Sequence, residues 1–229
     1  MDLFIYRIFN ALGDSIILST YFKAFDIKRV YYNRAELNLL QTIMKMYDVH
    51  DVEFIMHTDR ISNTMTEVVK KLNKEKIMLL PFQKQGDDLY ATIQLKSHHE
   101  SASDRSIQLN EAMPYVKYNM PVTHVGFEKN VHELYKVMNN SCQHISIDSG
   151  TAWFAASLGL DTTVISKNSY YFADAYIYMK YLESHKNVEI YQQHGKGVKI
   201  ANEFEYLQAA STNNVQVPPY QTYTSRAKL

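Results

Sequence analysis

The chain has 229 residues and a mass of 26.7 kDa, which allows one large globular domain or two small ones. Hydrophobic residues make up 46% and charged residues 21%, so extended disorder, a collagen-like helix and a coiled coil are all disfavoured. Because 24 lysines and arginines balance 24 aspartates and glutamates, no global positive field attracts nucleic acid or an anionic membrane, and any polyanion would have to meet a local patch.

The single cysteine, Cys142, excludes an internal disulfide and any multi-cysteine metal site, which fits a reducing compartment. The first residues carry no basic leader before their apolar run. No apolar stretch approaches the roughly 18 residues of a membrane span. We therefore expect a cytoplasmic protein without an integral membrane segment.

The first half of the chain alternates predicted strands with predicted helices. Short apolar runs predict strands at residues 3–9, 29–32, 52–56 and 77–80. Apolar residues at helical spacing predict helices at residues 16–25, 35–47 and 62–72, the first after a turn at residues 12–15. Strands that alternate with helices indicate parallel βαβ units.

A polar stretch at residues 81–88 is expected to form a linker or hinge, after which the same alternation resumes. Strands are predicted at residues 90–95, 122–125, 144–147, 163–166 and 188–191, and helices at 131–138, 151–158, 170–182 and 202–209. The pattern predicts two α/β halves, residues 1–85 and 86–210, followed by a tail at 211–229 that wraps over the surface or is loose.

The tripeptide Asp148-Ser149-Gly150 ends a predicted buried strand, and a predicted helix starts at once. Gly150 would let the backbone approach a ligand, and the free N–H groups and the helix dipole favour an anion such as a diphosphate. Asp148 and Ser149 could hydrogen-bond a sugar. The alternative is that Ser149 and Gly150 only cap the helix and turn the chain.

Residues 144–166 resemble the phosphate-binding segment of the ADP-heptose:lipopolysaccharide heptosyltransferase-like glycosyltransferases. That segment has a strand, Asp-(Ser/Thr)-Gly, a helix running into Ala-Leu-Gly and another strand. Asp148-Ser149-Gly150 and Ala156-Ser157-Leu158-Gly159 match it. Trp153 stands where the family commonly has a histidine, and an indole stacks where an imidazole would hydrogen-bond, so the resemblance does not identify the transferred sugar.

A second part of the resemblance is Gly13-Asp14, which follows the first predicted strand as Gly-Asp does in that family. The resemblance implies that Asp14, at the cleft between the halves, is the general base. A carboxylate within hydrogen-bond reach of the acceptor hydroxyl can take its proton. The alternative is that Asp14 is only an N-cap of the following helix.

Further donor contacts are implied by the resemblance after the next strands. Lys96, Ser97 and Arg105 are available to neutralise a leaving diphosphate, or they form a solvated basic loop. Glu128 is expected to contact the nucleotide, or else to start a helix favourably. No metal is expected, because the adjacent histidines at 98 and 99 point differently and nothing else has ligand spacing.

The resemblance implies a GT-B type fold, in which two Rossmann-like domains with parallel sheets face a cleft. The implied activity is a metal-independent glycosyltransferase that moves a sugar from a nucleotide-sugar donor, its substrate, to an acceptor hydroxyl, without a cofactor. The predicted catalytic residue is Asp14, and the predicted donor contacts are Gly13, Lys96, Ser97, Arg105, Glu128, Asp148, Ser149, Gly150, Thr151 and Trp153.

The chain is shorter than a usual member of that family, mostly in the first half, so the acceptor is expected to differ from lipopolysaccharide core. It would be a glycan or, in a phage-type enzyme, a hydroxymethylated DNA base. The remaining alternative is a module that binds a nucleotide or sugar and has lost transfer.

Overall fold

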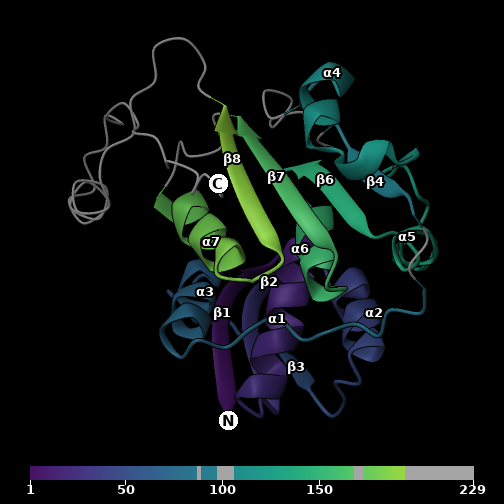
Figure 1. Cartoon of the computed structure of the whole chain (residues 1–229). Helices are drawn as coiled ribbons and strands as arrows, with labels where there is room; N and C mark the ends of the chain where they lie inside the picture. Colours follow the sequence, from purple (N-terminus) through teal and green to yellow (C-terminus); the bar gives the residue numbers. More distant parts are fainter. Residues whose placement is uncertain (87–88, 97–105, 168–172, 194–229) are drawn as a thin grey trace.

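The computed structural model describes residues 1–86, 89–96, 106–167 and 173–193, and in it the strands form two parallel sheets (Figure 1). The first sheet has the order β1 (Asp2–Ile8), β2 (Arg29–Ala35), β3 (Glu53–Met56). The second has the order β5 (Val122–His124), β4 (Ala91–Gln94), β6 (Gln143–Ile147), β7 (Asp161–Lys167), β8 (Val188–Gln193). Every pairing within both sheets is parallel, which confirms the predicted α/β class.

The helices are α1 (Leu12–Ala24), α2 (Asn38–Met46), α3 (Met65–Lys74), α4 (Leu109–Ala112), α5 (Val131–Met138), α6 (Gly150–Ser157) and α7 (Ala173–Glu183). Two of them, α1 and α6, are buried over most of their length and lie against each other. Residues 15–22 of α1 and 151–157 of α6 are all buried. A helix that is apolar on all sides belongs in a core. Helix α1 packs on α6, and α3 packs on α7, so each contact joins the two halves.

One apolar core runs through both halves of the molecule. It extends from Ile5 on β1 through Phe22 and Phe154 to Val164 and Val188 of the second sheet. The two halves, purple and green in Figure 1, therefore touch along α1 and α6 rather than facing each other across an open gap. Each sheet falls within one predicted half, while the domain boundaries themselves stay a prediction.

The apolar run at residues 77–80 was expected to form a fourth strand, and that expectation is wrong. Its backbone bonds to side chains instead of to a strand: the Tyr181 hydroxyl of α7 donates to the Ile77 carbonyl (2.8 Å), and the Leu79 N–H donates to Nε2 of His185, two residues after α7 (3.0 Å). Leu79 is buried. The run is a strap that ties the first half to the second.

The expected hinge at residues 81–88 is also anchored over its described part. The Phe82 N–H donates to the Ser157 carbonyl at the end of α6 (2.9 Å). The Phe82 ring stacks on Tyr47 (4.0 Å between centroids) and meets the edge of Phe154 (4.9 Å). Phe82 thus anchors this stretch to the core through its backbone and its ring, while a hinge role for residues 81–88 stays a prediction.

Several smaller differences concern helix boundaries. Residues 12–15, expected as a turn, form the first turn of α1, and α4 with the short 3₁₀ turns Met113–Tyr115 and Lys117–Asn119 was not expected. The predicted helix at 202–209, the tail at 211–229 and residues 170–172 of another predicted helix lie outside the described residues.

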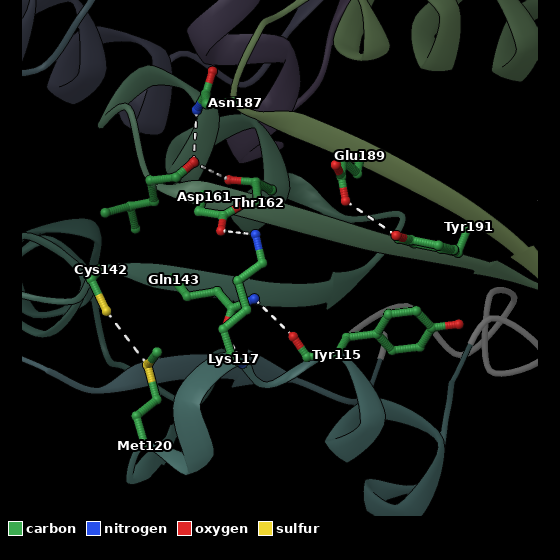
Figure 2. A network of polar contacts seen from close by, with 11 residues as sticks. Tyr115, Lys117, Met120, Cys142, Gln143, Asp161, Thr162, Asn187, Glu189 and Tyr191 are labelled. Carbon is green, nitrogen blue, oxygen red and sulfur yellow. Dashed lines mark hydrogen bonds and ion pairs between the residues drawn. The ribbon is translucent and has the colours of Figure 1, made fainter. Parts of the chain in front are cut away.

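A polar network at the amino ends of β6 and β7 fixes the segment before β5, as Figure 2 shows. Gln143 donates to the Tyr115 carbonyl (2.8 Å) and accepts from the Lys117 N–H (3.0 Å), while the Lys117 ammonium pairs with Asp161. Ligands of parallel α/β sheets bind at the carboxyl ends of the strands. This network therefore has a structural role, and a ligand site is expected at the opposite ends of the strands.

We predict that Phe82→Ala lowers the free energy of unfolding by about 3–5 kcal/mol, because the side chain fills the shared core. Urea unfolding followed by tryptophan fluorescence and by circular dichroism should give one coincident transition, since the halves share that core. Phe127→Ala is the matched control: Phe127 is 71% exposed, so its removal should cost less than about 0.5 kcal/mol. Two separate transitions in the wild type would contradict the single core.

Candidate functional site

Gly13 and Asp14 lie in the first turn of α1, which begins four residues after β1 ends. The N-cap is Ala11, whose carbonyl accepts from the Ser15 N–H (3.0 Å) and whose side chain makes no capping bond. Asp14 is the third residue of the helix. The alternative that Asp14 is the N-cap is therefore wrong, and its carboxyl group needs another explanation.

Asp148-Ser149-Gly150 joins the end of β6 to the start of α6, as predicted from the sequence. Ser149 occupies the N-cap position in an extended conformation, yet its side chain makes no capping bond to the helix. The Ser149 hydroxyl instead lies 2.5 Å from Gln94 Oε1. The first N–H groups of α6 therefore keep their capacity to bind an anion.

The starts of α1 and α6 touch each other. A Cβ added to Gly150 would lie 2.7 Å from Leu12 Cβ and 3.1 Å from the backbone nitrogen of Gly13. A Cβ added to Gly13 would lie 2.9 Å from Trp153 Cδ1. Both glycines are thus required by contact between the halves. Close approach to α1 is thus one reason for Gly150, and its expected close approach to a ligand stays a prediction.

Asp14 is half-buried at this contact. Burial raises the pKa of Asp14 from 3.8 to about 6, and among the described residues no charged or hydrogen-bonding group offsets this rise. The carboxylate is still ionised at neutral pH, and it is more basic than an ordinary aspartate. A general base works best when its pKa approaches the working pH.

Two buried hydroxyl groups beside the motifs have no hydrogen-bond partner among the described residues. They belong to Ser15, which follows Asp14, and to Ser146, which lies two residues before Asp148. Folded proteins pair nearly all such groups, so each exception calls for an explanation. Both exceptions in the described part of the chain lie next to the two motifs, which supports a site at this place.

Sequence reasoning missed a buried polar network that runs from Thr92 and His144, within β4 and β6, to Gln94 at the carboxyl end of β4 and to the start of α6. His144 lies between the hydroxyls of Thr92 (2.9 Å) and Thr151 (3.0 Å), and Gln94 Oε1 lies 2.5 Å from the hydroxyls of Thr151 and Ser149. Burial lowers the pKa of His144 to about 3, so the imidazole is neutral. The available signal was the polar residue at every second position of two predicted strands.

The other predicted donor contacts are Lys96, Ser97, Arg105 and Glu128. Lys96 is exposed just after β4, while Ser97 and Arg105 lie outside the described residues. The Glu128 carboxylate accepts from the Gly126 N–H (2.7 Å), which closes a local turn after β5. Their contacts with a donor stay predictions.

Trp153 lies inside the molecule rather than at an open surface. Its side chain packs on Gly13, it is 4% exposed, and its ring contacts Tyr178 and Tyr181 at 6.2 and 6.0 Å between centroids. These contacts give the indole a packing role between the halves. Its predicted contact with a sugar is not tested by them.

A hollow of about 400 Å³ lies elsewhere, on the first half. It is lined by β1, α1 and α3, with Phe4, Tyr21 and Lys71 among its walls, and it contains no residue of either motif. Within the described ranges, no group of three or more histidines, cysteines, aspartates or glutamates is placed to hold a metal ion. None of the described helices is long and apolar enough to span a membrane.

No family model and no curated protein sequence matches the chain. Among solved structures, the chain is similar to the iron-containing dodecameric glycosyltransferase TibC from enterotoxigenic E. coli H10407, with a TM-score of 0.47 and 11% sequence identity. The similarity covers 76% of this chain and 59% of that chain, so the match spans less than two thirds of that protein.

We predict that Asp14→Asn stabilises the protein by about 1–3 kcal/mol at pH 8. The native pKa of about 6 exceeds the unfolded value of 3.8, so the folded state binds the proton more tightly. Wild-type stability should therefore fall as pH rises from about 4 to 6, a loss that the asparagine variant lacks. Urea titrations at pH 4 and pH 8 measure this difference. Asp59→Asn, at a side chain 89% exposed, is the control and should show no such gain.

We predict that Gly150→Ala costs about 1–3 kcal/mol, because the new methyl group meets Leu12 Cβ and the backbone of α1, neither of which can rotate away. Gly86→Ala is the matched control. Its methyl group would lie 2.9 Å from Asn140 Oδ1, the end of a side chain that can move. Thermal unfolding distinguishes the two variants, and equal melting temperatures would contradict the assigned contact.

Proposed function

We propose that this chain is a glycosyltransferase that moves a sugar from a nucleotide-sugar donor to an acceptor hydroxyl without a divalent metal. The observation that carries the proposal is the contact between the starts of α1 and α6. One start holds a half-buried carboxylate of raised pKa, and the other is a helix N-terminus without a side-chain cap. A base and an anion-binding group thus lie at one place.

The donor diphosphate is assigned to the start of α6. The N–H groups of Gly150 and Thr151 belong to the first helical turn, where they have no intrahelical acceptor, and the helix dipole adds positive charge. Asp148 would repel a phosphate, so its carboxylate suits hydroxyl groups of the sugar or ribose. Lys96 lies two residues after β4, so it is at the carboxyl ends of the strands, where α6 also begins. Its long, exposed side chain suits the leaving diphosphate.

In the proposed step, the acceptor hydroxyl gives its proton to the Asp14 carboxylate as its oxygen bonds to the anomeric carbon of the sugar. The bond between that carbon and the diphosphate oxygen breaks, and the diphosphate leaves with the electron pair. The α6 N–H groups, already oriented, stabilise the developing negative charge. In this scheme, helix ends supply the positive charge that a cation supplies in metal-dependent transferases.

We predict that Asp14→Asn lowers turnover by roughly 10²–10⁴-fold and leaves donor affinity within a few fold, because an amide cannot accept the proton. The wild-type kcat/KM should fall below pH 6 as the carboxyl group takes up a proton. Release of nucleoside diphosphate is measured with a glycan acceptor, with hydroxymethylated DNA and with water alone, each with and without EDTA. Asp59→Asn serves as the control.

Three results would contradict parts of this proposal. Full turnover in Asp14→Asn would contradict the role of Asp14 as the base. Activity that depends on magnesium or manganese would contradict the metal-free mechanism. A wild type whose melting temperature no nucleotide sugar raises would remove the donor itself. Donor binding without transfer to any acceptor would instead favour a binding module.

A further inference from the structure

We propose that Gln94 is a positioning residue whose side-chain oxygen accepts hydrogen bonds from the hydroxyls of Ser149 and Thr151. Ser149 then faces the donor as a hydrogen-bond acceptor. The direction of these hydrogen bonds follows from the geometry alone, whereas the role of Ser149 toward the donor rests on the proposed function.

Gln94 is the last residue of β4 and is 3% exposed. Its Oε1 lies 2.5 Å from both Ser149 Oγ and Thr151 Oγ1, while its Nε2 donates to the Lys96 carbonyl (3.1 Å). If the Gln94 amide were flipped, its oxygen would face the Lys96 carbonyl oxygen, and neither atom could donate. Gly126 confines the side chain further, since a Cβ there would lie 3.0 Å from Gln94 Nε2. The amide is therefore held with its oxygen toward the two hydroxyls.

A count of protons sets the direction of these bonds. Thr151 has one hydroxyl proton and three neighbours that can accept it: Gln94 Oε1 at 2.5 Å, His144 Nε2 at 3.0 Å and Ser149 Oγ at 3.1 Å. If the proton went to His144 or to Ser149, the Thr151 and Gln94 oxygens would lie in hydrogen-bond contact with no hydrogen between them. Thr151 therefore donates to Gln94, and His144 Nε2–H donates to Thr151.

The other ring nitrogen must then accept. Thr92 Oγ1 lies 2.9 Å from His144 Nδ1 and 3.2 Å from the Gln143 carbonyl, so its proton can go to either. Because Nε2 carries the ring hydrogen, Nδ1 can only accept, and Thr92 donates to it. Burial keeps His144 uncharged, as its lowered pKa shows. The chain of donors runs from Thr92 through His144 and Thr151 to Gln94.

Ser149 contributes its proton to the same Gln94 oxygen. Its hydroxyl oxygen, on a half-buried residue at the start of α6, then has only lone pairs to offer. A sugar or ribose hydroxyl can donate to such an oxygen, whereas a phosphate, which has only acceptors, cannot. The phosphates are left to the backbone N–H groups, and Ser149 selects for a hydroxyl group.

The first test is the tautomer of His144 in ¹⁵N-histidine-labelled protein, measured by long-range ¹H–¹⁵N spectra. We expect the proton on Nε2. In Gln94→Met the Thr151 proton is released and can bond to His144 Nε2, so the tautomer should shift toward Nδ1–H. Gln41→Met, on the exposed face of α2, is the matched control and should leave the spectrum unchanged. A proton on Nδ1 in the wild type, or an unchanged tautomer in Gln94→Met, overturns the role of Gln94.

The second test uses pyrophosphate as the probe, titrated by calorimetry. Gln94→Met frees the Ser149 proton to bond to phosphate, so it should bind pyrophosphate about three- to tenfold more tightly than the wild type. Adding Ser149→Ala should abolish that gain. Unchanged or weaker binding in Gln94→Met overturns the acceptor role of Ser149. A wild type that does not bind pyrophosphate overturns that role together with the proposed phosphate site, while the histidine spectrum still decides the role of Gln94.

Discussion

The contact between the first turns of α1 and α6 is the constraint on which the rest of the molecule depends. It requires a glycine on each side, because Gly13 lies against Trp153 and Gly150 lies against Leu12. It also brings two positive helix ends together, which is unfavourable unless negative charge is near. Each motif carries an aspartate at this place, Asp14 within the first turn of α1 and Asp148 just before α6. The same arrangement that joins the halves therefore brings two helix N-termini and a carboxylate together, and the proposed donor site rests on this.

Stability and chemistry oppose each other at this contact. Asp14 is held where burial favours its neutral form, and the hydroxyls of Ser15 and Ser146 are buried without a described partner. These costs are offset elsewhere, by two helices that are buried on all sides and by Phe82, which packs between both halves. Buried groups that cost stability in this way are typical of functional sites.

Most of the secondary structure follows from local pattern, and the exceptions have a common cause. Residues 77–80 carry the same apolar signal as a buried strand, since burial is all that the pattern reports. Whether their backbone bonds to a neighbouring strand or to Tyr181 and His185 depends on residues about a hundred positions away. The polar stretch that follows looks like a linker for the same reason. Its anchoring by Ser157 is a long-range contact that no local window contains.

The sequence by itself determined the alternation of strands and helices, the two parallel sheets and the positions of Gly13-Asp14 and Asp148-Ser149-Gly150 at helix starts, because these depend on periodicity and turn chemistry. Tertiary structure alone decided that the two motifs touch and that Trp153 packs inside. It also decided that Gln94 and His144 join Ser149 in one network. Burial and partner choice depend on which side chains of distant segments share a face. Burial raises the pKa of Asp14, and the choice of partner sets the direction of each hydroxyl hydrogen bond.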